Sequence, residues 1–349
     1  MLNGKRIHFM GIGGIGMSGL ADIVYRRGHI VDGCDAKLGY AQRRLEQRGI
    51  PVELGHHPSH LASDVGLVVY SSAVLQDEPE LCEARARGIP TISRGALLAE
   101  VVKSKELIGI AGAHGKTTTS GMSAQLLVEA GWDPTVLVGG YMLSFGSNAR
   151  YGTGRYLVAE TDESDGSFLF LHPSVAIVTN IDREHLNYYG TLEKLIEAFQ
   201  QFVSQIDPNG VLIRCLDNPV TRQVLRHPQE LTYGLHPEAD VRATHIGRWG
   251  WGSEFAATYR GQRLGTFRLQ VPGGHNVINA LAVIGLGLSL EIPVTVIREA
   301  LQAFKGTARR FQRLELPNDI WFIDDYAHHP SEIRATLSAD PPAGRHQRG

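Results

Sequence analysis

The sequence predicts an α/β protein built on parallel sheets, and three features of the chain support this fold class. The first hundred residues alternate short apolar runs with helical patterns, as the units of a parallel sheet do. The alternation restarts near residue 106, where a second apolar run leads into a second glycine-rich loop. A chain of 349 residues is also long for a single core. We expect three units: an N-terminal Rossmann-like parallel sheet domain over 1–103, a central α/β domain with a small antiparallel sheet over 104–313, and the start of an incomplete Rossmann-like C-terminal domain over 314–349.

The elements of the first unit follow from local patterns. Short apolar runs predict strands, and apolar residues at helical spacing predict helices. The order strand, helix, strand, helix, strand is typical of a parallel sheet. In chain order the predicted elements are a strand over 7–10, a helix over 19–27, a strand over 30–34, a helix over 41–49 and a strand over 65–70.

The second unit opens with a buried-looking strand and keeps the same alternation for about a hundred residues. The predicted elements are strands over 106–111, 156–160 and 175–179, and helices over 192–203, 276–288 and 295–303.

Two parts of the chain depart from this alternation. Within residues 231–271, short alternating segments at 254–259 and 266–271 are separated by Gly-Gln and Gly-Ser, which is typical of antiparallel hairpins at a sheet edge. A new α/β unit then begins with a strand over 321–325 and a short helix that reaches Leu337. The chain finishes in DPPAGRHQRG, so this unit is expected to be incomplete.

The composition narrows the classes of function. The net charge is -2, from 34 basic and 36 acidic residues, and no basic stripe indicates a nucleic-acid partner. No apolar stretch approaches the roughly 18 residues that cross a bilayer, and the N-terminus has no signal-peptide pattern. Cys34, Cys82 and Cys215 are far apart, without metal or disulfide spacing. We expect a cytoplasmic protein with no membrane or nucleic-acid partner; its oligomeric state stays open.

The stretch MGIGGIGMSGLA forms a first phosphate-binding pattern. Gly11, Gly13 and Gly16 fit G-x-G-x-x-G between a predicted strand and helix, and Asp35 lies 19 residues beyond Gly16. Glycines allow close approach of a pyrophosphate to the backbone, and the carboxylate suits a ribose. The pattern specifies the anion and not the base, so a nicotinamide dinucleotide and a uridine diphosphate both remain possible.

The stretch LIGIAGAHGKTTTS forms a second phosphate-binding pattern. The strict P-loop glycine is replaced by Ile110, but the shorter G-x-x-G-K-T remains in Gly112, Gly115, Lys116 and Thr117. Backbone N–H groups can surround phosphates, the lysine can reach the β- and γ-oxygens, and the threonine hydroxyl can bind Mg²⁺. The central unit is therefore expected to be P-loop ATPase-like and to bind ATP with Mg²⁺.

Polar residues elsewhere could complete these two sites. The acidic run ETDESDGSF offers carboxylates for a metal, because neighbouring carboxylates repel one another unless a cation or solvent offsets them. His185 is open to three interpretations: a metal ligand, a phosphate contact or a helix-capping residue. Asn276 and Asn279 share one helix face and suit an adenine edge, with helix capping as the alternative for Asn276. Arg309 and Arg310 could clamp a phosphate or a carboxylate, with exposed surface arginines as the alternative.

The order of the motifs resembles one known family. GIGGIGMSGLA, SSAV, AHGKTTT, ETDESDGSF, TNIDREH, GGHNVINA, GTARRFQ and DDYAHHP follow one another as in the Mur ligase family of peptidoglycan synthesis. The resemblance runs from about residue 4 to about residue 337 and is strongest to the members that join L-alanine to UDP-N-acetylmuramate. It implies that the carboxylate of UDP-N-acetylmuramate attacks the γ-phosphate of ATP, and that the amine of L-alanine then attacks the acyl phosphate.

The resemblance also implies a role for each candidate residue. The residues implied in catalysis are Lys116, Glu160, His185 and Arg309, and those implied in metal binding are Thr117, Glu160 (with Glu163 as its alternative) and His185. The residues implied in ATP binding are Gly112, His114, Gly115, Lys116, Thr117, Thr118, Asn276, Asn279 and Asp324. The residues implied in binding the UDP-sugar are Gly11, Gly13, Gly14, Gly16, Asp35, Ser71, Ser72 and His114.

Two departures from the family pattern affect the expected activity. The residue before the metal-site histidine is usually aspartate in the family, and here it is Glu184. The family also carries a third domain that closes over ATP, whereas this chain stops soon after that domain's first strand and helix. We therefore expect weak or absent ligation, because closure and exclusion of water would fail. A non-catalytic protein that binds nucleotide and UDP-sugar is the alternative; for a nicotinamide-dependent oxidoreductase the second loop would have no role.

Overall fold

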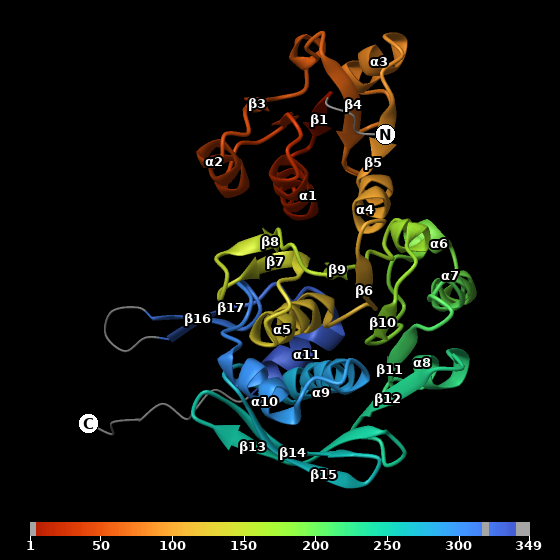
Figure 1. Ribbon diagram of the computed structural model, residues 1–349, viewed down its shortest axis with the longest axis vertical. Coiled ribbons are helices and arrows are strands. Elements are labelled where there is room, and N and C mark those ends of the chain that lie inside the picture. Colours follow the sequence, from red (N-terminus) through yellow and green to blue (C-terminus); the bar gives the residue numbers. More distant parts are fainter. Residues whose placement is uncertain (1–4, 316–320, 340–349) are drawn as a thin grey trace.

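The computed structural model describes residues 5–315 and 321–339, and Figure 1 shows its two large sheets following one another along the long axis. The tail DPPAGRHQRG, residues 340–349, lies outside the described residues. The predicted α/β class is confirmed by a parallel five-stranded sheet, a mixed ten-stranded sheet and a two-stranded antiparallel sheet. Among the described residues, no helix is both long enough and apolar enough to cross a membrane. The boundaries of the three expected units stay predictions.

The first sheet is parallel, with strand order β3-β2-β1-β4-β5. Its central strands are buried on both faces, which explains their short, continuous apolar runs. Leu20 and Val24 of the first helix pack against Phe9 and Val69 on one face. The elements are β1 (Arg6–Met10), α1 (Ile15–Arg26), β2 (Val31–Asp35), α2 (Tyr40–Gln47), β3 (Val52–Leu54), η1 (Pro58–His60), β4 (Val65–Tyr70), α3 (Pro79–Ala86), β5 (Thr91–Ser93) and α4 (Arg94–Val102).

The second sheet has the order β15-β14-β13-β12-β11-β10-β6-β9-β7-β8. The strand that carries the second glycine loop, β6, lies between two parallel neighbours. Three helices, α5, α9 and α10, cover one face of the sheet, and α7 covers the other. The strands are β6 (Glu106–Ala111), β7 (Thr135–Met142), β8 (Ser147–Arg150), β9 (Tyr156–Glu160), β10 (Val175–Val178), β11 (Val211–Cys215), β12 (Glu230–Gly234), β13 (Val241–Trp249), β14 (Gly252–Tyr259) and β15 (Gln262–Leu269). The helices are α5 (Lys116–Glu129), η2 (Ser167–Phe170), α6 (Leu186–Tyr189), α7 (Leu192–Ser204), α8 (Pro219–Val224), α9 (Gly274–Ser289) and α10 (Val294–Ala303).

The predicted hairpins lie at the edge of this second sheet, as the alternating pattern indicates. Strands β13, β14 and β15 are antiparallel to one another, and β13 is parallel to β12. The small antiparallel part of the central unit is therefore continuous with the parallel part. One face of this edge is buried under α9 and α10, which is why apolar and polar residues alternate along β14.

The predicted strand near residue 321 is present, but its pairing is antiparallel. β17 (Trp321–Asp324) pairs with β16 (Gln312–Glu315), which precedes it directly in the chain. The predicted helix follows as α11 (Pro330–Ser338), with Pro330 at its first position, where a missing N–H costs nothing. The end of this helix lies against the start of α9, because a Cβ on Gly273 would lie 3.0 Å from the Cβ of Ala339 (Figure 1).

Candidate active site

The second glycine loop joins β6 to α5 and has the backbone shape of a phosphate loop. Gly112 and Gly115 have φ of 130° and 82°, a backbone region that residues other than glycine rarely adopt. A Cβ on Gly112 would collide with the Thr179 hydroxyl and the Asn180 backbone. A Cβ on Gly115 would lie 2.6 Å from Asn279 Oδ1. Both glycines are therefore required for the loop to lie against these neighbours at the N-terminus of α5.

Lys116 begins α5 and turns back over this loop. Its Nζ donates to the carbonyl of Gly112 and lies 2.6 Å from Glu163 Oε1. Burial lowers the pKa of Lys116, but the carboxylates of Glu163 and Glu160 outweigh burial and hold this pKa above its usual value. The lysine is therefore a fixed positive charge at the loop, as an incoming phosphate group requires.

The two candidate metal carboxylates have different partners. Glu160 Oε2 accepts from the Thr117 hydroxyl at 3.0 Å and from the Gly139 N–H at 2.8 Å. Glu163 is buried and pairs with Lys116, while its Oε2 has no hydrogen-bond partner among the described residues. A threonine hydroxyl beside a carboxylate is the pair of oxygen ligands that suits Mg²⁺, so the residues fit that ion.

His185 precedes α6 and has a left-handed φ of 56°. Its side chain makes no capping hydrogen bond, so it does not cap the helix. Instead, Nε2 lies 3.6 Å from Glu163 Oε1. The contact with Glu163 raises the pKa of His185, and this outweighs the opposing effect of burial. His185 therefore contacts Glu163, which also pairs with Lys116, and not Glu160, which accepts from Thr117.

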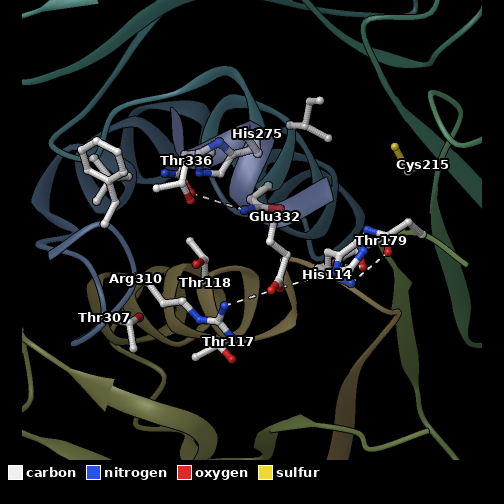
Figure 2. Close-up of a pocket in the computed structure, with 18 of the residues that line it drawn as sticks. His114, Thr117, Thr118, Thr179, Cys215, His275, Thr307, Arg310, Glu332 and Thr336 are labelled. Atoms are coloured by element: carbon white, nitrogen blue, oxygen red, sulfur yellow. Dashed lines mark hydrogen bonds and ion pairs between the residues drawn. The ribbon is translucent and has the colours of Figure 1, made fainter. Parts of the chain in front are cut away.

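The loop residue His114 faces the C-terminal helix. His114 Nε2 lies 3.2 Å from Asp182 Oδ2, and His114 Nδ1 lies 3.4 Å from Glu332 Oε1. Arg310 reaches the same carboxylate at 3.6 Å. Figure 2 shows Glu332 of α11 between Arg310 and His114. These charges attach α11 to the phosphate loop.

One cavity, of about 380 Å³, opens on the α9 side of the loop, and we call it the α9 cavity. Its walls include the buried Asn276 and Asn279, and α11 contributes Ala335 and Thr336. Asn276 Nδ2 donates to the Pro272 carbonyl at 2.7 Å, so part of this amide holds the start of α9. A mainly apolar cleft with a few amide and hydroxyl groups is typical of a nucleotide base site.

A second cavity, of about 710 Å³, extends from the phosphate loop to the first glycine loop, and we call it the interdomain cavity. Its wall is formed partly by loops and helices around the first sheet and partly by those around the second sheet. From the first sheet these are Gly14, Ile15, Gly16, Met17, Ser71, Ser72 and Arg94. From the second sheet and beyond they include Lys116, Thr117, Glu160, Asp162, His185, Arg309 and Tyr326.

The two cavities share part of their walls. Gly115, Thr117, Arg310 and Glu332 line both. The N-terminus of α5 therefore separates two clefts that meet at the position of the phosphate loop. Groups bound in the two clefts can reach one another at this point, as transfer of a group between two bound molecules requires.

Several candidates from the sequence lie beside these cavities without lining them. Asp35 accepts from the Gly13 N–H at 2.8 Å and from the Lys37 N–H at 3.0 Å, so it holds the first loop in shape. Asp324 lies 3.9 Å from Arg309. The next residue, Asp325, lines the α9 cavity and accepts from the Phe311 N–H. Gly11, Gly13 and Gly112 also belong to the loops rather than to the cavity walls.

Some residues at the site were missed by the sequence analysis. Arg94 begins α4, and its Nη2 lies 2.8 Å from Asp162 Oδ2, across the gap between the two sheets. Asn180 fixes the loop by accepting from the His114 N–H at 2.9 Å. Glu332 lies in the helix that the sequence treated only as part of a third unit. Asn180 follows the end of β10, a position where α/β sheets place binding residues, and this signal was available.

Comparison with known proteins agrees with this geometry. Residues 6–106 match the Mur ligase family catalytic domain, and residues 110–287 match the Mur ligase middle domain. The chain belongs to the Mur ligase family. The predicted family membership is thereby confirmed.

Two Mur ligase relatives and two solved structures show how far the similarity extends. The chain is 45% identical to UDP-N-acetylmuramate--L-alanine ligase of Pelobacter propionicus, over 96% of this chain and 73% of that protein. It is 47% identical to the same-named ligase of Sorangium cellulosum, over 96% of this chain and 72% of that protein. The structure of UDP-N-acetylmuramate-alanine ligase MurC from Thermotoga maritima has a TM-score of 0.88 at 33% identity, over 96% of this chain and 77% of that one. The structure of a murein peptide ligase from Psychrobacter arcticus has a TM-score of 0.82 at 29% identity, over 96% of this chain and 75% of that one.

Proposed function

We propose that this Mur ligase joins L-alanine to UDP-N-acetylmuramate with the hydrolysis of ATP to ADP and phosphate. The observation that carries the proposal is the pair of cavities that share Gly115 and Thr117 at the phosphate loop. One cleft suits a nucleoside triphosphate and the other suits a larger anionic substrate. The relatives named for this reaction match along almost the whole chain, which supports the same substrates here.

ATP is assigned to the α9 cavity. Its adenine would lie against Asn276 and Asn279, whose amides offer both a donor and an acceptor. Its phosphates would lie on the loop at the N-terminus of α5, where backbone N–H groups and the helix dipole favour negative charge. The residues assigned to the nucleotide are Gly112, His114, Gly115, Lys116, Thr117, Thr118, Asn276 and Asn279, and Asp324 is assigned a role through Arg309.

UDP-N-acetylmuramate is assigned to the interdomain cavity. Its pyrophosphate would lie at the first glycine loop and α1, beside Ser71 and Ser72. Its carboxylate would then point toward Lys116 and Thr117, where this cavity meets the other. The residues assigned to the UDP-sugar are Gly11, Gly13, Gly14, Gly16, Asp35, Ser71, Ser72 and His114, with Gly11, Gly13 and Asp35 shaping the loop.

Mg²⁺ is assigned to the oxygens of Thr117 and Glu160. When bound, the ion would neutralise negative charge on the transferred phosphate. His185 contacts Glu163, the carboxylate that also pairs with Lys116. Of the two carboxylates that the sequence left as alternatives, Glu160 is favoured, because Glu163 is already paired with the lysine.

The reaction follows from this arrangement. The muramate carboxylate oxygen attacks the γ-phosphorus of ATP, the bond to ADP breaks, and an acyl phosphate forms. The neutral amine of L-alanine then attacks the acyl carbon, and phosphate leaves the tetrahedral intermediate as the amide forms. Lys116 and Arg309 supply fixed positive charge near the anions, so most of the rate enhancement comes from positioning and electrostatics.

The test is product formation by the purified chain. ATP, Mg²⁺, UDP-N-acetylmuramate and L-alanine are supplied, released phosphate is measured, and mass spectrometry detects UDP-N-acetylmuramoyl-L-alanine. Against the weak or absent ligation expected from the sequence, we expect product, because the relatives named for this reaction match almost the whole chain. Product should form only when all three substrates are present, and it should be lost in Lys116→Met but not in Lys103→Met, an exposed lysine that lines neither cavity. Binding of ATP and UDP-sugar without product would contradict the ligase and favour the non-catalytic binding protein.

A further inference from the structure

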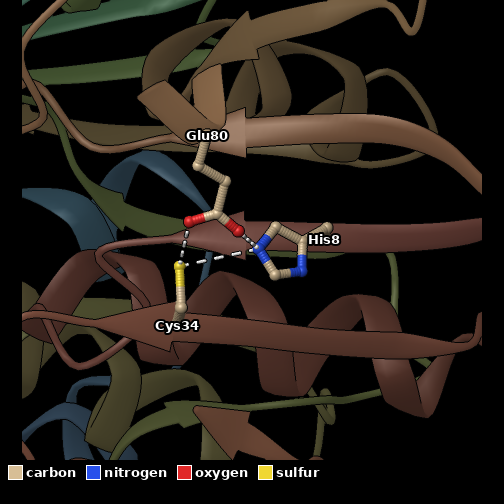
Figure 3. Close-up of side chains that lie close together, drawn as sticks. All are labelled: His8, Cys34 and Glu80. Carbon is tan, nitrogen blue, oxygen red and sulfur yellow. Dashed lines mark hydrogen bonds and ion pairs between the residues drawn. The ribbon is translucent and has the colours of Figure 1, made fainter. Parts of the chain in front are cut away.

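A buried cluster of metal-binding residue types lies in the first sheet, and none of its residues lines either cavity. His8 is on β1, Cys34 is on β2 and Glu80 is on α3, and their side chains are 1%, 0% and 0% exposed. Figure 3 shows the three side chains turned toward one another, between the two strands and the helix. No metal-binding spacing surrounds Cys34 in the sequence, because the three residues come from three separate segments.

The distances between the polar atoms are close to those of a coordination shell. Cys34 Sγ lies 3.2 Å from Glu80 Oε2 and 3.6 Å from His8 Nε2, and His8 Nε2 lies 2.9 Å from Glu80 Oε1. Ligands of a tetrahedral zinc ion, at bond lengths of about 2.0–2.3 Å, are separated by about 3.3–3.8 Å. The three atoms would therefore need only small shifts to bind one ion.

Two further histidines border the same carboxylate. His56 Nδ1 lies 3.0 Å from Cys34 Sγ and 3.6 Å from Glu80 Oε2. His60 Nδ1 lies 3.4 Å from Glu80 Oε1. His60 Nδ1 is buried and has no hydrogen-bond partner among the described residues. Glu80 Oε1 is paired with His8 Nε2 at 2.9 Å, so a bound ion would take the place of this contact.

The ring of His8 is held in the orientation that a metal ligand needs. Its other nitrogen, Nδ1, lies 2.7 Å from Asp32 Oδ1, and Asp32 is held in turn by Arg6 at 2.9 Å. A carboxylate on the far nitrogen of a metal-binding histidine fixes the ring and raises its basicity. Nε2 of His8 therefore faces Cys34 and Glu80.

We propose that this cluster is a structural zinc site with His8, Cys34 and Glu80 as its protein ligands, and with His56 beside Cys34 and Glu80. Thiolate, imidazole and carboxylate together suit Zn²⁺, a borderline-soft ion that accepts all three. Binding replaces the thiol proton of Cys34 and the Nε2 proton that His8 donates to Glu80, and both protons pass to solvent. The ion links α3 and the segment before η1 to the two central strands. Cys34 also accepts from the Gly11 and Ile12 N–H groups through its carbonyl, so the same strand end holds the first glycine loop.

The test uses the full-length chain, stripped with a chelator and then loaded with Co²⁺ or Zn²⁺. We expect one Zn²⁺ per chain by elemental analysis, a thiolate-to-cobalt charge-transfer band, and a higher melting temperature with zinc. Cys34→Ser is expected to lose the band and the thermal shift, whereas Cys82→Ser, an exposed cysteine, keeps both. Asp32→Asn, which leaves the three protein ligands in place, is expected to weaken zinc affinity by about 10–100-fold.

Three outcomes would overturn the proposal. The first is a chain that retains no zinc against a competing chelator and shows no charge-transfer band. The second is zinc binding that survives in Cys34→Ser, because the ion would then lie elsewhere, for example at His114, Glu184 and His329. The third is a band that Cys82→Ser removes. Circular dichroism of each variant without metal establishes that a lost band does not reflect an unfolded chain.

Discussion

At the scale of single residues, the active site separates two carboxylates that are close in the chain. Glu160 bonds the Thr117 hydroxyl and the Gly139 N–H, whereas Glu163 pairs with Lys116. The first is therefore free of a full positive charge and suits a divalent cation. The second neutralises the lysine, so its removal would change the charge of the loop rather than a metal site.

A matched pair of variants separates these roles. In Glu160→Gln we expect the Mg²⁺ concentration for half-maximal activity to rise at least about tenfold, because one anionic ligand is lost. In Glu163→Gln we expect little change in that concentration but a lower melting temperature, because Lys116 loses its buried partner. Magnesium titrations of phosphate release measure the first effect. Equal magnesium requirements in the two variants would contradict the assignment.

At the scale of elements, the phosphate loop depends on its contact with the segment after β10. Gly112 lies against Thr179 and Asn180, and the His114 N–H is held by the Asn180 side chain. The C-terminal helix α11 is attached to the same loop through Glu332. The loop is thus fixed from both sides, and each contact can be tested on its own.

Gly112→Ala tests the close approach of this loop. We expect loss of ATP binding, because the new Cβ would push the loop away from Thr179 and Asn180. Gly131→Ala is the matched control: its φ of 75° is also left-handed, but a Cβ there would meet no atom within 4 Å. The control therefore carries only the backbone strain, of about 1–2 kcal/mol. Isothermal titration measures the affinity of each variant for ATP. Similar affinities in Gly112→Ala and Gly131→Ala would mean that the loop tolerates displacement.

The attachment of α11 should depend on pH. Burial raises the pKa of Glu332, but His114 and Arg310 outweigh it and lower this pKa from 4.5 to about 2. Burial lowers the pKa of His114, but Glu332 and Glu184 outweigh it and raise this pKa above 6.5. Ionised Glu332 stabilises the contact between α11 and the phosphate loop above about pH 4.5, and this stabilisation is lost as the pH falls toward 2. Protonated His114 stabilises the same contact below about pH 6.5, and this stabilisation is lost as the pH rises further.

Hydrogen exchange measures this dependence directly. After correction for the intrinsic exchange rate, we expect α11 to be best protected between about pH 4.5 and 6.5, and less protected on either side. Glu332→Gln should flatten the profile. Helix α10 serves as the internal reference, because its buried residues are apolar apart from the backbone. A profile of α11 that follows α10 at every pH would show that these charges do not hold the helix.

At the scale of the whole molecule, the two sheets form one site only where they meet. Asn148, on β8 of the second sheet, donates to the carbonyl of Ile15 at the start of α1. Arg94, on α4, pairs with Asp162 from the acidic segment beyond β9. These contacts place the first glycine loop opposite the phosphate loop, so the interdomain cavity exists because the sheets are held together.

Arg94→Ala tests this link. We expect the KM for UDP-N-acetylmuramate to rise about tenfold or more, because a charge-assisted hydrogen bond worth about 1.5–3 kcal/mol is lost beside the cavity. The KM for ATP should change far less, since Arg94 does not line the α9 cavity. Arg155→Ala, an exposed arginine paired with Glu106, is the control. Steady-state kinetics with each substrate varied in turn measures both KM values. Equal changes in the two values would contradict the assignment of UDP-N-acetylmuramate to the interdomain cavity.

The sequence predicted what is encoded locally and missed what is assembled from distant segments. Glycine spacing and the Gly-Lys-Thr run located both loops, and periodicity located α7, α9 and α10. The hairpin of β7 and β8 was missed because Gly139 and Gly140 interrupt its apolar run. The antiparallel pairing of β17 was missed because pairing is a tertiary property. The contact of Arg94 with Asp162, and the cluster of His8, Cys34 and Glu80, join residues that nothing in their local patterns connects.

The common wall of the two cavities has a consequence for inhibitor design. A bivalent molecule with a nucleoside at one end and a sugar acid at the other could occupy both clefts if its linker passes Thr117. Its second arm would bind as an intramolecular event, so its affinity could exceed that of either arm by about 10²–10⁴. Such a compound would compete with both substrates at once, whereas a ligand confined to one cleft is displaced by a rise in a single metabolite.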